Sequence, residues 1–148
     1  MRTSSRYLIT TLGFLGLAPF VASMIAYHVD WFHASSISQK LFISYGAIIL
    51  SFLSGAVWGQ VIEQPYQAKG RILLIGSNLV TIGAWIALIV EQPQLSLLLL
   101  LLGYVSLFWT EVRWLKMLRT DNSFYPGMRF VLTAIVCSLH VLMLYPRY

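Results

Sequence analysis

The sequence predicts an all-α integral membrane protein, a bundle of five transmembrane helices, and two observations carry this prediction. Of the 148 residues, 58% are apolar and only 10% are charged, whereas soluble domains have about 25% charged residues. The apolar residues also fall into five blocks of about 20 residues, the length at which a helix crosses a hydrocarbon core of about 30 Å. Because the connections are short, we exclude a separate soluble or catalytic domain and expect one five-helix domain over residues 1–148.

Local signals justify the individual helices. The blocks predict helices over about 7–27, 41–62, 72–90, 95–114 and 129–145. The first block is longer than the about 7–15 apolar residues of a signal peptide, so we expect it to be retained, with cleavage near Ala22 as the alternative. Ser36 and Gln39 fit a capping box that would start the second helix. Pro93 and Pro126 lie just before or within the first turns of the last two helices, where a missing N–H costs little.

Small residues recur on one face of the second predicted helix, four residues apart. They are Ala47, Ser51, Gly55 and Gly59. Because lipid is as apolar as leucine, membrane helices associate where small side chains let two backbones approach closely. We therefore interpret this face, widened by Gly46 and Ser54, as a packing surface for another helix of this chain or of another protein. The second helix is accordingly expected to be the centre of the bundle.

Two other patterns predict the surface of the bundle. The run of leucines from Leu97 to Leu102 has no specific chemistry, and we expect it to face lipid, with an apolar contact surface for a larger complex as the alternative. Many Tyr and Trp residues lie near predicted helix ends, as in the aromatic belts of membrane proteins. The expected belt residues are Tyr7, Tyr27, Trp31, Tyr45, Trp85, Trp109, Trp114, Tyr125 and Tyr145.

The distribution of Lys and Arg predicts the orientation. Eight of these residues lie on the side of the N-terminus and two on the other side. The eight are Arg2, Arg6, Lys69, Arg71, Arg113, Lys116, Arg119 and Arg129, and the two are Lys40 and Arg147. Basic loops remain in the cytoplasm, so we expect a cytoplasmic N-terminus and an external C-terminus. The net charge of +5 is thereby explained without nucleic acid as a partner.

His140 is the one ionisable residue expected near the middle of the membrane. It lies about 11 residues into the fifth predicted helix, or roughly 16 Å along the helix axis. Thr133 and Cys137 share its helix face. Polar groups at this depth are costly and are candidate functional sites. We interpret His140 as a packing histidine that donates one interhelical hydrogen bond, and a proton relay or a cofactor ligand is the alternative.

Further polar side chains gather at the predicted cytoplasmic end of the bundle. Trp58 ends the second helix, Asn78 lies two turns into the third, Glu111 ends the fourth and Arg129 starts the fifth. We expect Glu111 to pair with Arg129 across a helix interface as a structural contact. The alternative is a shallow site for a headgroup, a quinone or a partner. The candidate polar site therefore comprises these four residues and His140.

The sequence offers little support for a metal or a cofactor. Cys137 is the only cysteine, which excludes a disulfide framework and a cysteine metal cluster. His28, Asp30 and His33 could hold zinc, but the loop also fits an amphipathic segment at the membrane interface. We favour the interface and expect neither a metal nor a cofactor.

Part of the sequence resembles a known family. Residues Ser44 to Gly55, SYGAIILSFLSG, followed by Trp58-Gly59, resemble the signature of small integral membrane proteins classed as a bacterial domain of unknown function. That family includes a mitochondrial relative, transmembrane protein sixty-nine. Supporting residues are Gly16-Leu17-Ala18-Pro19-Phe20, Trp85, and Arg129 with Leu132-Thr133. The resemblance implies a multi-pass protein of the bacterial inner membrane with no known activity.

The sequence also departs from the family at three positions. Val57 stands where the family often has histidine before the Trp-Gly pair, which argues against catalysis at that position. Glu111 replaces a usual aspartate, and the proline often found near Asn78 is absent.

These observations favour a non-catalytic accessory or assembly subunit that packs against a larger membrane complex. No nucleophile and base occur at a catalytic spacing, so we expect no catalytic residues and no enzyme activity. The alternative is a small transporter or a lipid- or quinone-binding protein, although the inverted repeat and paired broken helices of transporters are not evident. The expected partners are the lipid bilayer and either a membrane protein or a second copy of the chain.

Overall fold

The computed structural model describes residues 2–30, 35–62, 68–115 and 124–145, and the regular elements among them are all helical. The helices are α1 (Arg2–Leu15), α2 (Ala18–Val29), α3 (Ser35–Val61), α4 (Ala68–Ile89), α5 (Pro93–Thr110), the π-helical turn η2 (Glu111–Leu115) and α6 (Phe124–Leu144). Five spans among the described residues are long and apolar enough to cross a membrane. This confirms the predicted all-α bundle with five crossings.

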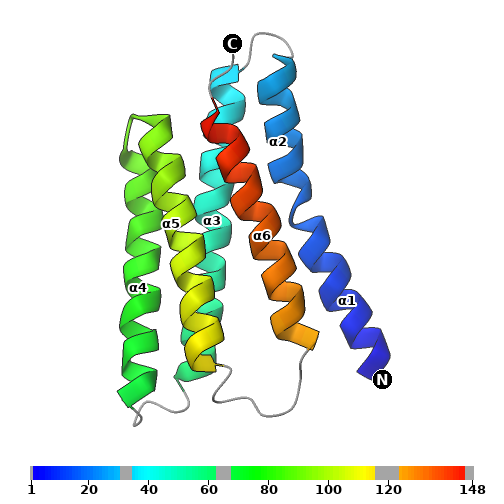
Figure 1. The fold of residues 1–148 in the computed structure, drawn as a ribbon, viewed down its shortest axis with the longest axis vertical. Helices are drawn as coiled ribbons and strands as arrows, with labels where there is room; N and C mark the ends of the chain where they lie inside the picture. Colours follow the sequence, from blue (N-terminus) through cyan, green and yellow to red (C-terminus); the bar gives the residue numbers. More distant parts are fainter. Residues whose placement is uncertain (1, 31–34, 63–67, 116–123, 146–148) are drawn as a thin grey trace.

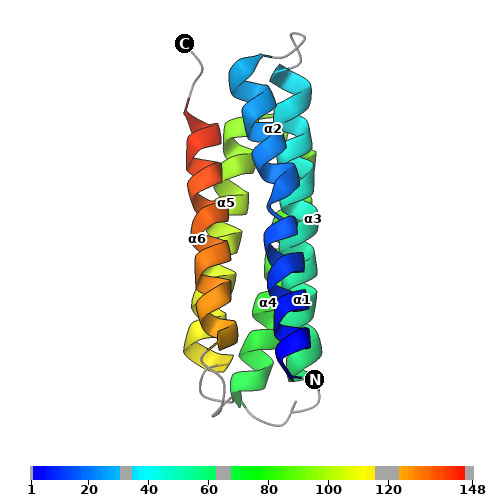
Figure 2. The same cartoon turned by 90° about the vertical axis from the view of Figure 1, so that its right-hand side faces the viewer.

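The helices run along one common axis, and the chain enters at one end of the bundle and leaves at the other. Figures 1 and 2 show α1 starting at one end and α6 finishing at the opposite end. The end at which α1 begins also holds the ends of α3 and α5 and the starts of α4 and α6. We call it the basic end, because Arg6, Arg71, Arg113 and Arg129 lie there.

Helix α3 is the centre of the bundle, as the sequence predicts, since it packs against α2, α4 and α5. Its buried residues include Phe42, Gly46, Leu50, Ser54 and Val57. Their spacing of three and four residues places them on one face of the helix. The face that α3 turns into the bundle is therefore centred on Gly46 and Leu50.

The first crossing is broken, whereas the sequence predicts one continuous helix. Helix α1 ends at Leu15 and α2 begins at Ala18. Pro19 explains the break, because proline has no N–H and its ring clashes with the carbonyl four residues earlier, which here belongs to Leu15. The Tyr45 hydroxyl donates a 2.9 Å hydrogen bond to the Gly16 carbonyl inside the break. Polar backbone freed within a membrane needs such a partner.

Tyr45 therefore does not belong to the aromatic belt, and this part of the prediction is wrong. Its side chain is half-buried and packs against Phe20 with ring centroids 4.9 Å apart. Belt residues such as Trp85, Trp109 and Tyr145 are largely exposed. Trp31 and the side chain of Tyr125 lie outside the described part of the chain.

All five predicted helices begin earlier than predicted, and two of these starts bear on the local signals in the sequence. Helix α3 begins at Ser35 rather than near Leu41, so Ser36 already lies in its first turn and is not the N-cap of a capping box. Helix α6 begins at Phe124 and contains Pro126 in its first turn. Mostly polar residues, 35–40, extend α3 beyond its apolar block, whereas the residues that extend α6, 124–128, include aromatic residues, Pro and Gly. The apolar blocks mark only the part that the hydrocarbon core requires.

The leucine run of α5 is not a uniform lipid-facing surface. Leu97 and Leu100 are fully buried, while Leu98 and Leu102 are exposed. Beyond the run, α5 approaches α3 so closely that a Cβ added at Gly103 would lie 2.5 Å from Leu50 Cδ2. A third of the run, Leu97 and Leu100, is thus core, because α5 lies against both α3 and α4.

Candidate functional site

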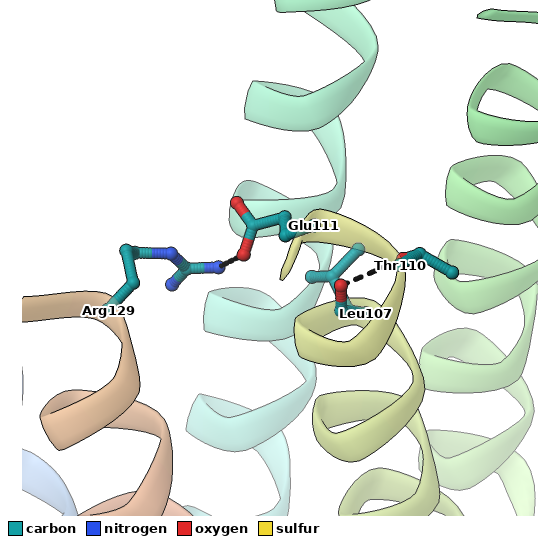
Figure 3. A network of polar contacts seen from close by, with 4 residues as sticks. All are labelled: Leu107, Thr110, Glu111 and Arg129. Carbon is teal, nitrogen blue, oxygen red and sulfur yellow. Dashed lines mark hydrogen bonds and ion pairs between the residues drawn. The ribbon is translucent and has the colours of Figure 1, made fainter. Parts of the chain in front are cut away.

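Glu111 and Arg129 form a buried ion pair near the basic end, as the sequence predicts. Arg129 Nη2 lies 2.5 Å from Glu111 Oε2, and both side chains are less than a tenth exposed. Figure 3 shows Arg129 extending from α6 toward Glu111 at the end of α5. The pair joins α5 to α6 and leaves no net charge at this position.

The backbone around Glu111 departs from the α-helix. Glu111 starts the π-helical turn η2, and its N–H donates to the carbonyls of both Leu107 and Phe108. The Thr110 hydroxyl also donates to the Leu107 carbonyl at 2.8 Å, as drawn in Figure 3. Single π-turns inside α-helices occur frequently at functional sites. Here the turn coincides with the residue that pairs with Arg129.

One donor of Arg129, its Nε–H, is not used in the ion pair. Arginine has five N–H donors and no acceptor. The Nε atom of Arg129 is buried and has no hydrogen-bond partner among the described residues. A buried donor without an acceptor costs free energy, so this Nε–H reduces the net stability that the ion pair contributes.

His140 is fully buried and surrounded by aromatic rings. The rings of Phe42, Tyr104 and Phe20 have centroids 4.8, 5.3 and 5.8 Å from that of His140. Its Nδ1 atom lies 2.8 Å from the carbonyl of Val136, one turn earlier in α6. The expectation of an interhelical hydrogen bond is therefore wrong, because the bond stays within α6.

The opposite side of the imidazole faces α3. A Cβ added at Gly46 would lie 3.3 Å from His140 Nε2, and Nε2 has no hydrogen-bond partner within the described part of the chain. Gly46 thus provides the room that the imidazole occupies. The sequence pattern places Gly46 on the small packing face but does not reveal this contact with His140.

Tyr104 is a second residue that sequence reasoning missed. Its hydroxyl donates a 2.7 Å hydrogen bond to the Gly46 carbonyl, and the side chain is buried. A signal was available, since Tyr104 stands in the middle of the fourth apolar block and a buried tyrosine hydroxyl usually finds a partner. Tyr104 connects α5 to α3 beside His140.

The predicted polar site does not assemble as one cluster. Trp58 is 41% exposed. Asn78 is exposed and donates to the Leu74 carbonyl of its own helix at 2.8 Å. Arg129 and His140 lie on one face of α6, separated by Thr133 and Val136 at the spacing of helical turns. Among the five predicted residues, Glu111 and Arg129 are the two that the described structure joins to each other by a hydrogen bond.

One part of the small packing face of α3 is buried in the bundle, and the other part is exposed. Ala47 is buried, Ser51 is half-buried, and Gly55 and Gly59 are exposed. A Cβ at either glycine would have no heavy atom from elsewhere in the described chain within 4 Å. The described residues therefore pack only on the part of the face around Ala47, away from the basic end.

The loop that the sequence analysis considered for zinc is described only in part. His28 Nδ1 is 3.0 Å from the Met24 carbonyl, within α2. His33 lies outside the described residues. In the described ranges, no three His, Cys, Asp or Glu side chains are grouped as metal ligands.

Comparison with known proteins gives a family match and a distant relative. Residues 5–145 match the model of a family described as "Protein of unknown function (DUF3429)". Transmembrane protein 69 of Xenopus tropicalis is 29% identical over 127 residues, which cover 84% of this chain and 48% of the relative. The chain thus spans about half the length of that relative. No solved structure matches the chain.

Proposed function

From the premise that this chain belongs to the DUF3429 family of proteins of unknown function, we propose that it is a non-catalytic accessory or assembly subunit of a larger membrane complex. We place it in the bacterial inner membrane with its basic end in the cytoplasm. One observation carries the proposal: Gly55 and Gly59 face outward from α3 instead of into the bundle.

The two glycines belong to an outward stripe of α3. Ile48 and Phe52 precede them on this stripe, and both side chains are more than half exposed. Bulky apolar side chains are the ordinary residues on a surface that only lipid covers. Glycine in a helix costs about 1 kcal/mol relative to alanine, and lipid gains nothing from its small size.

A second helix does gain from glycine at this place. Two glycines four residues apart let another backbone approach closely, and this close packing is a principal source of helix association in membranes. The described part of this chain does not use the pair. We therefore assign the Gly55–Gly59 surface to a transmembrane helix of a partner protein.

The polar groups of the bundle fit this role. Ser54 of α3 donates a hydrogen bond to the Ser77 carbonyl of α4, and Thr81 donates to Ser54 Oγ at 3.1 Å. Tyr45 donates to the Gly16 carbonyl in the break of the first crossing, and Tyr104 donates to the Gly46 carbonyl of α3. These contacts hold helices together, which leaves the outward face of α3 free to be a rigid docking surface.

Substituting Gly55 with leucine should remove the protein from its complex without destabilising the protein itself. The new side chain would block a partner helix, but within the bundle it enters open space, and leucine is the better helix former. Native gels of membranes in a mild detergent, with mass spectrometry of the comigrating proteins, test this. The expected result is a high-mass band for the wild type and its loss in the Gly55→Leu variant.

The matched control is Gly83→Leu in α4. Gly83 likewise has no atom within 4 Å of an added Cβ, so the substitution is the same but the helix differs. We expect this variant to comigrate with the complex. The proposal is refuted if the wild type migrates as a monomer or if Gly55→Leu stays in the complex.

A further inference from the structure

Helix α4 carries a polar side chain on the surface that it turns toward the membrane. Asn78 is exposed and lies about 12 Å along the helix from Gly70, where the apolar span of α4 begins. The span ends at Ile89, so Asn78 lies near the middle of the crossing. Water is absent at this depth, and a polar group without a hydrogen-bond partner is costly there.

The Asn78 amide has more hydrogen-bonding capacity than its own helix uses. Nδ2 donates a 2.8 Å bond to the Leu74 carbonyl, the one side-chain hydrogen-bond partner of Asn78 among the described residues. An amide has a second N–H and an oxygen that accepts two bonds. Ser106 and Ser138 are also exposed, but each has a single O–H, and it donates within the same helix. Asn78 therefore needs a further partner that hydrocarbon chains do not supply.

Asn78 belongs to a regular row of exposed residues. Ile75, Ile82 and Ile89 recur every seven residues, and each side chain is more than half exposed. Asn78 and Trp85 lie between them at the alternating spacing of three and four residues, and both are exposed. This is the spacing of the two contact positions of a left-handed coiled coil, with isoleucine at every position of one kind. We call these five residues the α4 seam.

The bundle packs on the opposite side of α4. The buried residues of this helix are Leu73, Ser77, Ala84 and Ala87, and its main contacts are with α3 and α5. Figure 1 shows α4 at the margin of the bundle, on the side away from α1. The α4 seam is thus left uncovered by the described residues, and it lies on a different helix from the Gly55–Gly59 surface.

The orientation of membrane proteins favours a second copy as the occupant of the seam. Copies of one protein enter the bilayer in the same orientation, because the same basic loops stay on the same side. Two copies that pack through α4 are then related by a two-fold axis along the membrane normal. Identical residues of the two helices lie at the same depth, so Asn78 meets Asn78. An amide is complementary to itself, since each N–H can donate to the oxygen of the other.

We propose that this protein forms a parallel homodimer through the α4 seam, in which the two Asn78 amides exchange hydrogen bonds at the centre of the interface. Ile75 and Ile82 pack on either side of the amide pair, as apolar residues flank the buried asparagine that fixes register in a coiled coil. Arg71 continues the spacing at the basic end, where its long side chain can extend to the membrane surface. The dimer forms without the partner complex proposed above, because the two surfaces belong to different helices.

Sedimentation equilibrium of the purified chain in a mild detergent tests for the dimer without any partner protein. We expect a reversible monomer–dimer equilibrium for the wild type. Asn78→Leu should weaken dimerisation about tenfold, the effect of losing hydrogen bonds of the strength found between membrane helices. The monomer should keep its fold, because the described hydrogen bond of Asn78 stays within α4 and leucine is the better helix former.

The matched control is Ser106→Leu in α5. Like Asn78, Ser106 is an exposed polar residue of a membrane span whose side chain bonds to its own helix, here to the Gly103 carbonyl at 3.1 Å. We expect Ser106→Leu to leave the dissociation constant of the dimer unchanged.

Disulfide formation in membranes locates the interface. In a Cys137→Ala background, Ile82→Cys puts a thiol on the α4 seam, and Leu102→Cys puts one on the exposed side of α5. The two depths are similar, since Ile82 lies seven residues before the end of α4 and Leu102 nine residues after the start of α5. We expect mild oxidation to cross-link two copies through Ile82→Cys and not through Leu102→Cys.

The outcomes separate the α4 seam from other surfaces. A wild type that stays monomeric at all concentrations, or an Asn78→Leu variant that dimerises as tightly as the wild type, refutes the proposal. Equal cross-linking through Leu102→Cys, or cross-linking of Ile82→Cys to a different protein only, refutes a homodimer through this seam. If Asn78→Leu does not fold, the pair of cysteine variants still decides. These failures leave the Gly55–Gly59 proposal standing, because its test uses the native complex.

Discussion

Replacing Glu111 with alanine is expected to lower the free energy of unfolding by about 3–5 kcal/mol, the range measured when one partner of a buried ion pair is removed. The loss arises because Arg129, whose side chain is only 8% exposed, would keep its charge without a counterion. Reversible unfolding by increasing SDS in mixed micelles measures this change.

The controls for this prediction separate the pair from each of its members. Glu91 is exposed at the opposite end of the bundle, so Glu91→Ala should change stability by less than about 0.5 kcal/mol. Replacing Glu111 and Arg129 together with leucine should restore most of the stability, because an apolar pair of similar volume is often neutral or stabilising. A loss in Glu111→Ala no larger than in Glu91→Ala would contradict the prediction.

Replacing Gly103 with alanine should be the second most damaging change, at about 1–3 kcal/mol for overpacking a core. The added Cβ would lie 2.5 Å from Cδ2 of Leu50, and Leu50 is fully buried, which limits its movement. Elsewhere in a helix the same substitution stabilises, because alanine is the better helix former. The same SDS titration measures the size and the sign of the change in the free energy of unfolding.

A double-mutant cycle tests whether Leu50 is the obstacle. Leu50→Ala alone should cost about 2–5 kcal/mol through the cavity that it leaves. In the double variant the methyl group of Gly103→Ala occupies part of that cavity. The double variant should therefore lose less free energy of unfolding than the sum of the losses in the two single variants. Additive losses would show that the Cβ meets a different obstacle. Gly83→Ala, in open space, serves as the stabilising control.

The sequence was sufficient to predict five crossings because the thickness of a bilayer imposes a length on every span. The contact between Glu111 and Arg129 could also be predicted, from the positions of these residues at the ends of their spans. Both are charged residues at the ends of apolar blocks on the same side of the membrane, where each lowers the cost of burying the other. The number of crossings and the position of each charge relative to its span can both be read from the single apolar blocks and from their order along the chain.

The rotation of each helix about its axis could not be predicted in this way. Spacing shows that Ala47, Gly55 and Gly59 share a face but does not reveal which part of that face the bundle covers. The contacts of Gly46 with His140 and of Tyr45 with Gly16 likewise depend on which helices become neighbours. The broken first crossing had a signal in Pro19, but membrane helices tolerate proline when neighbouring groups satisfy the backbone.

The break in the first crossing has a consequence for how the molecule comes apart. None of the described side chains of α1, residues 5–15, is buried, and α1 is separated from α2 at Gly16 and Leu17. Segments with few buried contacts open at a lower free energy than the core of the same protein. We therefore expect α1 to open at a lower free energy than the helices that contain the buried core.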